Sequence, residues 1–201
     1  MSSFWDAKFD RDGYTYGTRP NGFLESQAFR LNRSMTALVP GDGEGRNGIW
    51  LAEQGLSVLS VDSSKLGQGK ARGLAAERGV SMQFELADLL EWQWPRASYD
   101  LVVSIFFHLH GTDRPRLHAA MLAALKPGGL LLMEAFRPEQ LAFRSGGPKD
   151  LDLLFSRDLL ARDFAGAEIL SLEDANPVLD EGPLHQGQAA TVRLVALQRG
   201  V

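Results

Sequence analysis

The chain has 201 residues, a length that suits one large domain and is short for two. It contains no cysteine, which excludes disulfides, thiolate-bound metal and a cysteine nucleophile. Its formal net charge of −4 disfavours the basic surface of a nucleic-acid-binding protein. The longest apolar runs, such as residues 101–107, are far shorter than the roughly 20 residues that span a bilayer, and the acidic, aromatic N-terminus does not resemble a signal peptide. We therefore expect a cytoplasmic protein that has neither a membrane nor a nucleic acid as its partner.

The first 33 residues form a polar, aromatic arm whose second half favours a helix. Asn21 is a suitable N-cap for a helix over 21–32, with an apolar stripe that includes Phe23 and Leu24. From residue 34 onwards, apolar runs alternate with amphipathic segments. The sequence predicts helices at 47–54, 65–78, 113–125 and 155–164, and strands at 35–39, 56–61, 80–86, 99–106, 130–135, 168–172 and 190–198.

Strands that alternate with helices are typical of a parallel sheet with helices on both faces. We expect a single α/β domain over 1–201, a Rossmann-like doubly wound sheet of about seven strands, mostly parallel with an antiparallel last strand. Residues 1–33 would cover the site as an arm and a helix, and residues 34–201 would form the core. In such sheets ligands bind beyond the carboxyl ends of the strands, so the residues that follow each strand are the site candidates.

A glycine-rich turn, Gly41-Asp42-Gly43-Glu44-Gly45, joins the first expected strand to the next helix. Glycine lets the backbone turn sharply and lets a ligand approach the main chain, and the helix N-terminus adds amide donors. Asp62 ends the second strand, 21 positions after Gly41 (62 − 41). A carboxylate at this separation can accept both hydroxyls of a ribose, so the pattern predicts a cofactor that contains a nucleoside.

Two cofactor classes share this pattern. Gly43, Gly45 and Gly48 match the dinucleotide spacing G-x-G-x-x-G, whereas Gly41, Gly43 and Gly45 give the tighter G-x-G-x-G. The tighter spacing is favoured because the expected strand ends directly before Gly41. Glu44 also favours it, because a carboxylate in the turn would repel a pyrophosphate. S-adenosylmethionine has no phosphate and carries a sulfonium and an ammonium.

Further motifs follow the turn in a specific order. They are Ala52-Glu53-Gln54-Gly55, Ser60-Val61-Asp62-Ser63-Ser64, Ala87-Asp88-Leu89, Tyr99-Asp100-Leu101-Val102-Val103-Ser104-Ile105-Phe106, Leu125-Lys126-Pro127-Gly128-Gly129 and Glu134-Ala135-Phe136-Arg137-Pro138-Glu139-Gln140-Leu141. With the turn, these motifs resemble class I S-adenosylmethionine-dependent methyltransferases, most of all the tellurite-resistance and thiopurine-methyltransferase-like branch. The resemblance covers essentially the whole chain.

The resemblance implies a role for each matching residue. The turn glycines would face the methionine part of the cofactor, and Asp62 would hold the ribose with Ser63 at the border of the adenine. Asp88 would accept from the adenine amino group, with Leu89 beside the ring. The residues that the resemblance implies for S-adenosylmethionine are Gly41, Asp42, Gly43, Gly45, Asp62, Ser63, Asp88, Leu89, Ser104 and Ile105.

The chain departs from the family pattern at Val39. The family usually carries an acid at this position, two residues before its first turn glycine, where it helps to hold the cofactor's ammonium. We hypothesise that Asp42 or Glu44 substitutes electrostatically for the missing acid.

The N-terminal arm supplies candidate residues for enclosing the substrate. In the resembling enzymes such an arm folds over the cofactor, and aromatic faces attract a sulfonium. Trp5 and Tyr16 are therefore candidate substrate-pocket residues. The alternative is that both rings simply pack on the outer helices.

Polar residues after the fourth and fifth strands are candidates for the reaction itself. His108 is the candidate general base, because histidine titrates near neutral pH, and His110 is a second candidate for the substrate pocket. Arg137 would recognise an anionic substrate or pair with Glu139. The chain has four histidines and no cysteine, and neither His108 nor His110 has the spacing of a metal pair, so no metal is expected.

Methyl transfer to a small molecule is the reaction that these features favour, with a thiol, a metalloid oxyanion or a small metabolite as the acceptor. Because the cofactor's sulfonium is already activated, alignment matters more than a catalytic side chain. One alternative is a protein that binds the cofactor or a partner without catalysis. Another is an NAD(P)-dependent oxidoreductase. The sequence leaves open whether the protein is a monomer or a homodimer.

Overall fold

The computed structural model describes residues 2–200, and the side chains of residues 4–200. These residues form two compact units. Of the described residues, unit 1 comprises 2–92 together with Glu181–Leu184, and unit 2 comprises Gln93–Asp180 together with 185–200.

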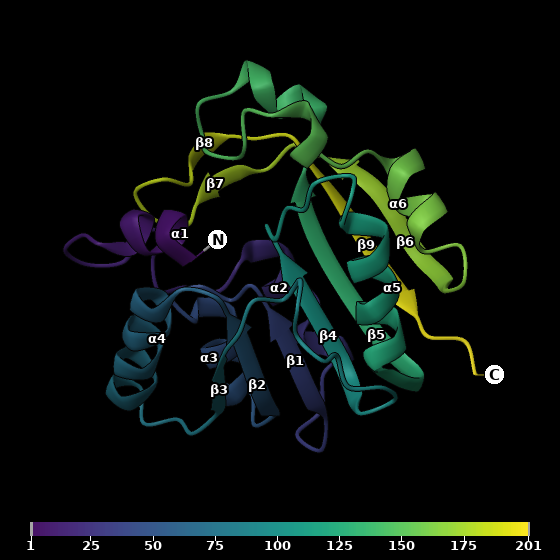
Figure 1. The fold of residues 1–201 in the computed structure, drawn as a ribbon, viewed down its shortest axis with the longest axis horizontal. Coiled ribbons are helices and arrows are strands. Elements are labelled where there is room, and N and C mark those ends of the chain that lie inside the picture. The colour runs from purple at the N-terminus through teal and green to yellow at the C-terminus, as the bar shows by residue number, and fades with distance from the viewer. Residues whose placement is uncertain (1, 201) are drawn as a thin grey trace. The chain divides into compact units, whose positions relative to one another are not determined.

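Unit 1 is a parallel three-stranded sheet with two helices packed on it. The strands lie in the order β3-β2-β1. The helix α3 contacts β1, β2 and α4, and α4 contacts β2 and β3, so the two helices cover one face (Figure 1). The elements are α1 (Ser2–Phe9), α2 (Gly22–Ser26), η1 (Ala28–Arg30), β1 (Thr36–Pro40), α3 (Arg46–Glu53), β2 (Ser57–Asp62), α4 (Lys65–Glu77) and β3 (Gln83–Leu86).

The register of unit 1 aligns the carboxyl ends of its strands. Pro40 at the end of β1 is opposite Val61, and Asp62 at the end of β2 is opposite Leu86. The ladder continues past the ends, because the Gly41 amide donates to the Val61 carbonyl at 2.8 Å and the Ala87 amide donates to the Asp62 carbonyl at 3.0 Å. The segments that follow β1, β2 and β3 therefore emerge side by side at one edge.

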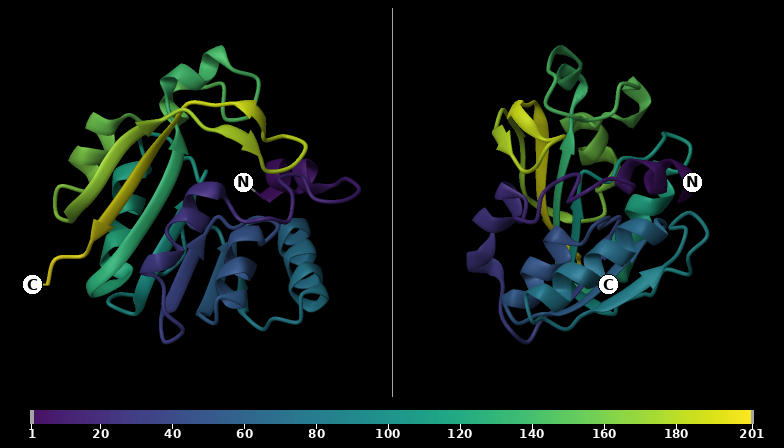
Figure 2. Two further views of the ribbon diagram at one scale, coloured as in Figure 1. Left: turned by 180° about the vertical axis from the view of Figure 1, so that it is seen from behind. Right: turned by 90° about the vertical axis from the view of Figure 1, so that its left-hand side faces the viewer.

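Unit 2 contains four strands of sheet in the order β4-β5-β9-β6. β4 pairs with β5 in parallel, and β9 runs antiparallel to both β5 and β6. Figure 2 shows β9 in yellow between these two strands. The elements are β4 (Tyr99–Ile105), α5 (Arg114–Ala124), β5 (Leu125–Phe136), η2 (Pro138–Ala142), η3 (Leu151–Leu153), α6 (Arg157–Asp163), β6 (Glu168–Ala175), β7 (Val178–Asp180), β8 (Gln186–Gln188) and β9 (Thr191–Leu197).

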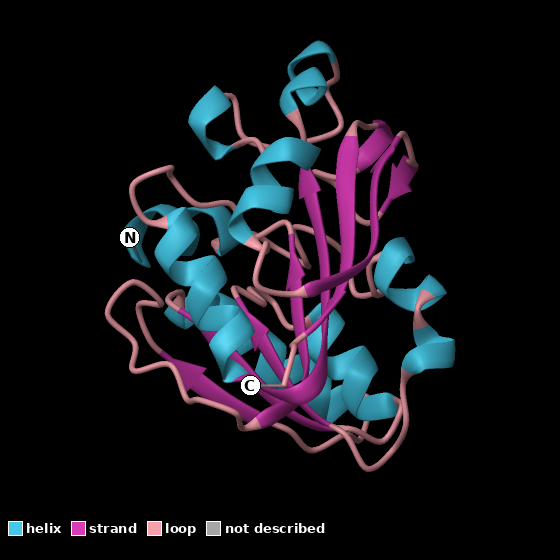
Figure 3. Ribbon diagram, turned by 90° about the vertical axis from the view of Figure 1, so that its right-hand side faces the viewer, coloured by secondary structure: helices cyan, strands magenta, loops and turns pink. Residues whose placement is uncertain are grey.

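Two features of unit 2 extend beyond its sheet. The chain between β5 and α6 folds into the short helical turns η2 and η3 past the carboxyl end of β5 (Figure 1, Figure 3). β7 and β8 pair as a small antiparallel hairpin, whose tip, Glu181–Leu184, is part of unit 1. The packed core of the sheet is formed by buried apolar runs such as residues 130–133, which explains why the strands were predictable.

The expected fold class is confirmed. Within the described residues, the two units contribute three and four strands of mostly parallel direction, and the last strand is antiparallel. The domain limits 1–33 and 34–201 stay a prediction. Within the part of the chain that the structure describes, no helix is both long and apolar enough to cross a membrane.

The helix expected over 21–32 is wrong in its length. Asn21 caps α2 as expected, since its side chain accepts from the Leu24 amide at 3.0 Å. The helix ends at Ser26, whose hydroxyl donates to the Phe23 carbonyl at 2.6 Å. This local bond competes with the helical pattern, and the chain continues as the short turn η1. The sequence also gave no sign of α1, β7 or β8, and it placed the start of β5 too late.

Candidate functional site

The glycine turn leads from β1 into α3 in a conformation that only glycine adopts easily. Gly41, Gly43 and Gly45 have φ values of 67°, 57° and 86°, which lie in the left-handed region. The Gly43 amide donates to Oδ2 of Asp62 at 2.8 Å. The turn at the end of β1 is thus bonded directly to the acid at the end of β2.

Gly45 and Gly48 leave room for close packing behind the turn. A Cβ at Gly45 would lie 2.6 Å from the Cβ of Ala71, so the absence of a side chain lets α3 begin against α4. A Cβ at Gly48 would collide with Oδ2 of Asp42 and lie 2.8 Å from the methyl carbon of Met82. Gly48 is therefore needed for the close packing of α3. This packing explains why a glycine lies at the position that completes the G-x-G-x-x-G spacing.

Asp62 has a buried carboxylate that can accept more hydrogen bonds than it already does. Its two carboxylate oxygens accept from the Gly43 amide and from the Ser64 amide, each at 2.8 Å. A carboxylate can accept about four hydrogen bonds, so this acid can still accept from a further donor in addition to the amides of Gly43, Ser63 and Ser64. Burial raises the pKa of Asp62, and the amide donors act against this rise. The arrangement fits a hydroxyl of a ribose.

The segment after β3 supplies the other expected nucleoside contacts. Asp88 is exposed and accepts from the Leu90 amide at 3.0 Å, while Leu89 is buried. The Asp62 carbonyl accepts from Ala87, directly before Asp88. The predicted ribose and adenine ligands therefore emerge from adjacent strands of one unit.

Asp42, the second residue of the turn, has a buried side chain. It is 8% exposed, and its Oδ1 accepts from the Gly48 amide at 3.3 Å, within the first turn of α3. Its Oδ2 has no hydrogen-bond partner among the described residues. Burial raises the pKa of Asp42 to about 7, and the nearby Asp62 also raises it. Asp42 is therefore a poor electrostatic substitute for the acid that Val39 replaces.

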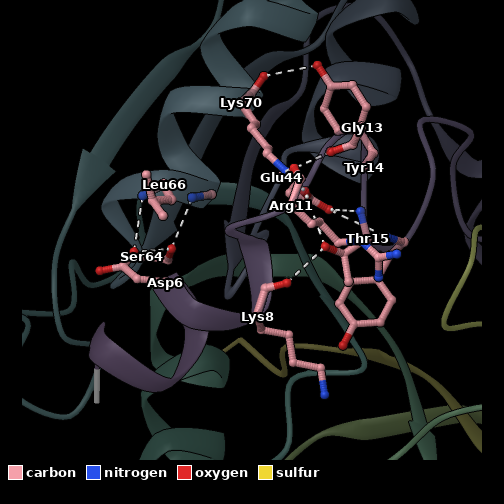
Figure 4. Close-up of polar contacts among 12 residues, drawn as sticks. Asp6, Lys8, Arg11, Gly13, Tyr14, Thr15, Glu44, Ser64, Leu66 and Lys70 are labelled. Carbon is pink, nitrogen blue, oxygen red and sulfur yellow. Dashed lines mark hydrogen bonds and ion pairs between the residues drawn. The ribbon is translucent and has the colours of Figure 1, made fainter.

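Glu44 holds the N-terminal arm (Figure 4). Its buried carboxylate accepts from the Thr15 amide at 2.7 Å and forms an ion pair of 3.0 Å with Nζ of Lys70. The same Lys70 ammonium donates to the carbonyls of Arg11 at 2.9 Å and Gly13 at 2.6 Å. The carboxylate that was expected to face the cofactor's ammonium thus binds residues of the arm.

The helix α1 is fixed to the same region by a polar and an apolar contact. Oδ1 of Asp6 accepts from the hydroxyl of Ser64 at 2.6 Å and from the Leu66 amide at 3.1 Å, at the start of α4 (Figure 4). The ring of Phe9 covers two glycines, since a Cβ at either Gly43 or Gly67 would lie 3.0 Å from it. The arm therefore lies directly against the glycine turn.

The expected pocket residues Trp5 and Tyr16 both pack on Phe9. The Trp5 ring stacks on it at 5.7 Å between centroids, and the Tyr16 ring meets it edge-on at 6.3 Å. Burial raises the pKa of Tyr16 to about 12, so its hydroxyl stays protonated. These contacts give both rings a packing role in the arm.

Arg46 and Glu181 form a buried ion pair next to the turn. Nη2 of Arg46 donates to Oε2 of Glu181 at 2.8 Å. Oε1 of Glu181 accepts from Nδ2 of Asn21 at 3.0 Å and from the Gly22 amide at 3.1 Å. The tip of the β7–β8 hairpin is thereby tied to α2 and α3.

In unit 2, the residue directly after β4 is strained. Ser104 and Ile105 are buried, and the Ser104 hydroxyl has no hydrogen-bond partner among the described residues. Phe106 then adopts a φ of 53°, which is costly for a side chain of this size. Its ring stacks on Phe136 at 4.3 Å and meets His185 edge-on at 4.9 Å. These aromatic contacts hold the strained turn.

Both ring nitrogens of His108 form hydrogen bonds to main-chain groups beside the same cluster of aromatic rings. Nδ1 is 2.6 Å from the Leu153 carbonyl, and Nε2 is 3.4 Å from the Phe136 amide. Nδ1 must therefore carry the proton that it donates, and Nε2 accepts. Burial lowers the pKa of His108 to about 4. This geometry supports a structural role and argues against the general base that the sequence suggested.

His110 and Arg137 have separate partners. His110 is exposed and pairs with Asp152 at 3.0 Å. Arg137 forms an ion pair with Glu139 at 2.8 Å and donates to Oδ1 of Asn176 at 2.7 Å. The pairing with Glu139, one of the two alternatives for Arg137, is therefore present.

Sequence reasoning missed three residues of this region: Phe9, Arg46 and Glu181. Phe9 lies in a segment without helical periodicity. Glu181 is separated from Arg46 by 135 positions in a segment that showed no pattern. Only Arg46 carried a signal, since it directly follows the last glycine of the turn.

Comparison with known proteins gives this geometry a context. Residues 37–129 match a family model described as a methyltransferase domain. A tRNA (uracil(54)-C(5))-methyltransferase from Pyrococcus abyssi is 27% identical over 186 residues, which cover 86% of this chain and 41% of the relative. The chain thus spans less than half the length of this curated relative.

Solved structures agree on the fold. One, from a study of the conversion of a disulfide bond into a thioacetal group during echinomycin biosynthesis, has a TM-score of 0.80 at 19% identity and covers 99% of this chain and 92% of its own. TehB from Haemophilus influenzae has a TM-score of 0.72 at 18% identity, with 98% and 67% covered. The N-methyltransferase NodS from Bradyrhizobium japonicum, in complex with S-adenosyl-L-homocysteine, has a TM-score of 0.72 at 13% identity, with 99% and 98% covered. Residues 37–129 therefore match a methyltransferase domain, and the solved structures share the fold of this chain.

Proposed function

We propose that this protein transfers a methyl group from S-adenosylmethionine to a small-molecule acceptor. The observation that carries the proposal is the bond between the Gly43 amide and the Asp62 carboxylate, because it joins the glycine turn to the acid that would accept from the ribose. The residues 1–33 would act as the arm and residues 34–201 as the core of one methyltransferase domain.

Unit 1 offers groups that fit the nucleoside part of the cofactor. Asp62 accepts from main-chain amides and retains accepting capacity for a ribose hydroxyl. Asp88, on the neighbouring segment, is exposed and available to the adenine amino group, with Ser63 and Leu89 beside the ring. When bound, the cofactor supplies an activated methyl group, so the side chains have to bind, orient and exclude water.

The arm is the element that would exclude water. Asp6 and Phe9 hold it to α4 and to the glycine turn, and Glu44 and Lys70 hold the loop that follows. Closure over the turn would shield a bound sulfonium from solvent. We propose Trp5 and Tyr16 as the rings that support this closed arm, and therefore as part of the substrate enclosure.

A small acceptor is favoured over a nucleic acid by charge. The chain has a formal net charge of −4, whereas a protein that binds tRNA needs basic side chains for the phosphates. The tRNA methyltransferase named above is a much longer protein than this chain. We propose a thiol, a metalloid oxyanion or a small metabolite as the acceptor, and a monomer or homodimer in the cytoplasm as the active form.

The test is a transfer assay with methyl-labelled S-adenosylmethionine. The acceptors are a panel of low-molecular-mass thiols, selenite, tellurite and small amines, with bulk tRNA as the competing class. The proposal expects label in a small product, and loss of that label in Asp62→Ala because the ribose loses its acceptor. Asp12→Asn, which removes an exposed acid of the same unit, is the matched control and should keep full transfer. Label in tRNA alone would contradict the small-molecule assignment.

A further inference from the structure

Arg46 is a buried cation with an unfilled hydrogen-bonding position. It is the first residue of α3 and is 6% exposed. Nη2 donates to Glu181, but Nη1 is buried and has no hydrogen-bond partner among the residues that the structure describes. A buried donor of this kind is unfavourable when its hydrogen bond is unmade. An acceptor supplied by a ligand would satisfy this donor.

The guanidinium is held in place by groups that are themselves fixed. Glu181 is 9% exposed and accepts from Asn21 and Gly22 in addition to Arg46. The Asn21 amide in turn donates to Oδ1 of Asn47 at 2.9 Å. Because both carboxylate oxygens of Glu181 are used in this way, the guanidinium is oriented before any ligand arrives.

Glu44 and Asp62, two acids around the turn, already form hydrogen bonds to other groups. Glu44 binds Thr15 and Lys70, and Asp62 accepts from two amides at the end of β2. Oδ2 of Asp42 is buried and lies against Gly48. Val39, where an acid would hold an ammonium, is apolar. Recognition of a zwitterionic group here would therefore depend on its negative end.

The order of the strands indicates which part of the cofactor reaches Arg46. With the adenine at Asp88 after β3 and the ribose at Asp62 after β2, the next position along the edge is the turn after β1. The remaining part of S-adenosylmethionine is its amino-acid end. The carboxylate is the anionic group of that end, and both a guanidinium and a helix N-terminus attract an anion.

We propose that Nη1 of Arg46 binds the carboxylate at the amino-acid end of S-adenosylmethionine, while Glu181 holds Nη2. The assignment rests on the proposed function. Because Val39 stands where an acid usually binds the ammonium, this chain would recognise the amino-acid end of the cofactor through its carboxylate instead.

The test compares two ligands by calorimetry. S-adenosylmethionine has the carboxylate, and decarboxylated S-adenosylmethionine keeps the sulfonium and the ammonium but lacks it. The variant Arg46→Met with Glu181→Gln removes the guanidinium without leaving a buried unpaired carboxylate, and the glutamine oxygen still accepts from Asn21. Arg72→Met, which removes an exposed arginine of α4, is the control for charge.

The wild type and Arg72→Met should prefer S-adenosylmethionine by about ten- to a hundredfold, the range for one hydrogen bond to a charged group. The double variant should lose this preference by binding S-adenosylmethionine more weakly, with its affinity for the decarboxylated ligand unchanged. A preference that survives in the double variant overturns the proposal. An equal loss of both ligands in a variant that still unfolds cooperatively also overturns it, since the pair would then be structural. A wild type that binds neither ligand refutes the proposed function itself, and the wild-type titration alone reveals that failure.

Discussion

The replacement Asp42→Asn should make the protein more stable above neutral pH. The pKa of Asp42 is raised from 3.8 to about 7 mainly by burial, so the folded state resists its ionisation. A shift of about three pH units corresponds to roughly 4 kcal/mol at about 1.4 kcal/mol per unit. Asparagine has nearly the same shape and no charge to bury.

The sign of the effect follows from proton linkage. The folded protein keeps the Asp42 proton up to about pH 7, whereas the unfolded chain releases it near pH 3.8. The contribution of this group to stability is therefore fully present below about pH 4, and it is lost as the pH rises from about 4 to about 7. Asp42→Asn should match the parent near pH 4 and exceed it by up to about 4 kcal/mol at pH 8.

Urea unfolding at a series of pH values measures this difference directly. The exposed replacement Asp12→Asn is the control for a lost negative charge, and it should shift stability by a few tenths of a kcal/mol without this pH dependence. The reasoning is refuted if the Asp42→Asn and parent curves stay parallel from pH 4 to pH 8.

Three further predictions follow from the same contacts. Gly48→Ala should lower the stability measured by thermal unfolding by about 1–3 kcal/mol, because the new Cβ would collide with Asp42. Gly73→Ala in α4, where no atom lies within 4 Å of the new Cβ, should raise it by about 0.5–1 kcal/mol, and equal effects of the two replacements would contradict the packing argument. Glu44→Gln should speed amide hydrogen exchange in residues 10–16, because the arm loses its ion pair with Lys70, whereas Glu53→Gln, which breaks a surface ion pair, should leave exchange there unchanged. Protection that persists in Glu44→Gln would show that the arm is held by its apolar contacts. The pKa of His108 is lowered to about 4, so the pH profile of methyl transfer between pH 5 and 8 should keep its shape in His108→Asn, and a midpoint that disappears in this variant would restore the general base.

The strands and the glycine turn were predictable because their signals are local. Residues 35–39 and 56–61 are apolar runs bounded by breakers, and the three turn glycines are required by their positive φ values. The position of Asp62 followed from the strand that it ends. The fold class could therefore be inferred from one sequence.

The arm and the hairpin were not predictable because long-range contacts specify them. The helix α1 has no apolar period, and it is held by Asp6 and Phe9 against residues that lie up to 60 positions away. Glu181 becomes part of the site only when the chain returns to α2 and α3. Glu44 was likewise assigned a role towards the cofactor. Its contacts with Thr15 and Lys70 could not be foreseen, because these partners lie far from it in the sequence.

The central claim is the cofactor, and calorimetry of the purified protein tests it most directly. S-adenosylmethionine, S-adenosylhomocysteine and NADH would be titrated separately. The proposed function predicts that the first two bind and that NADH does not. Binding of NADH alone, or of none of the three, would contradict the assignment.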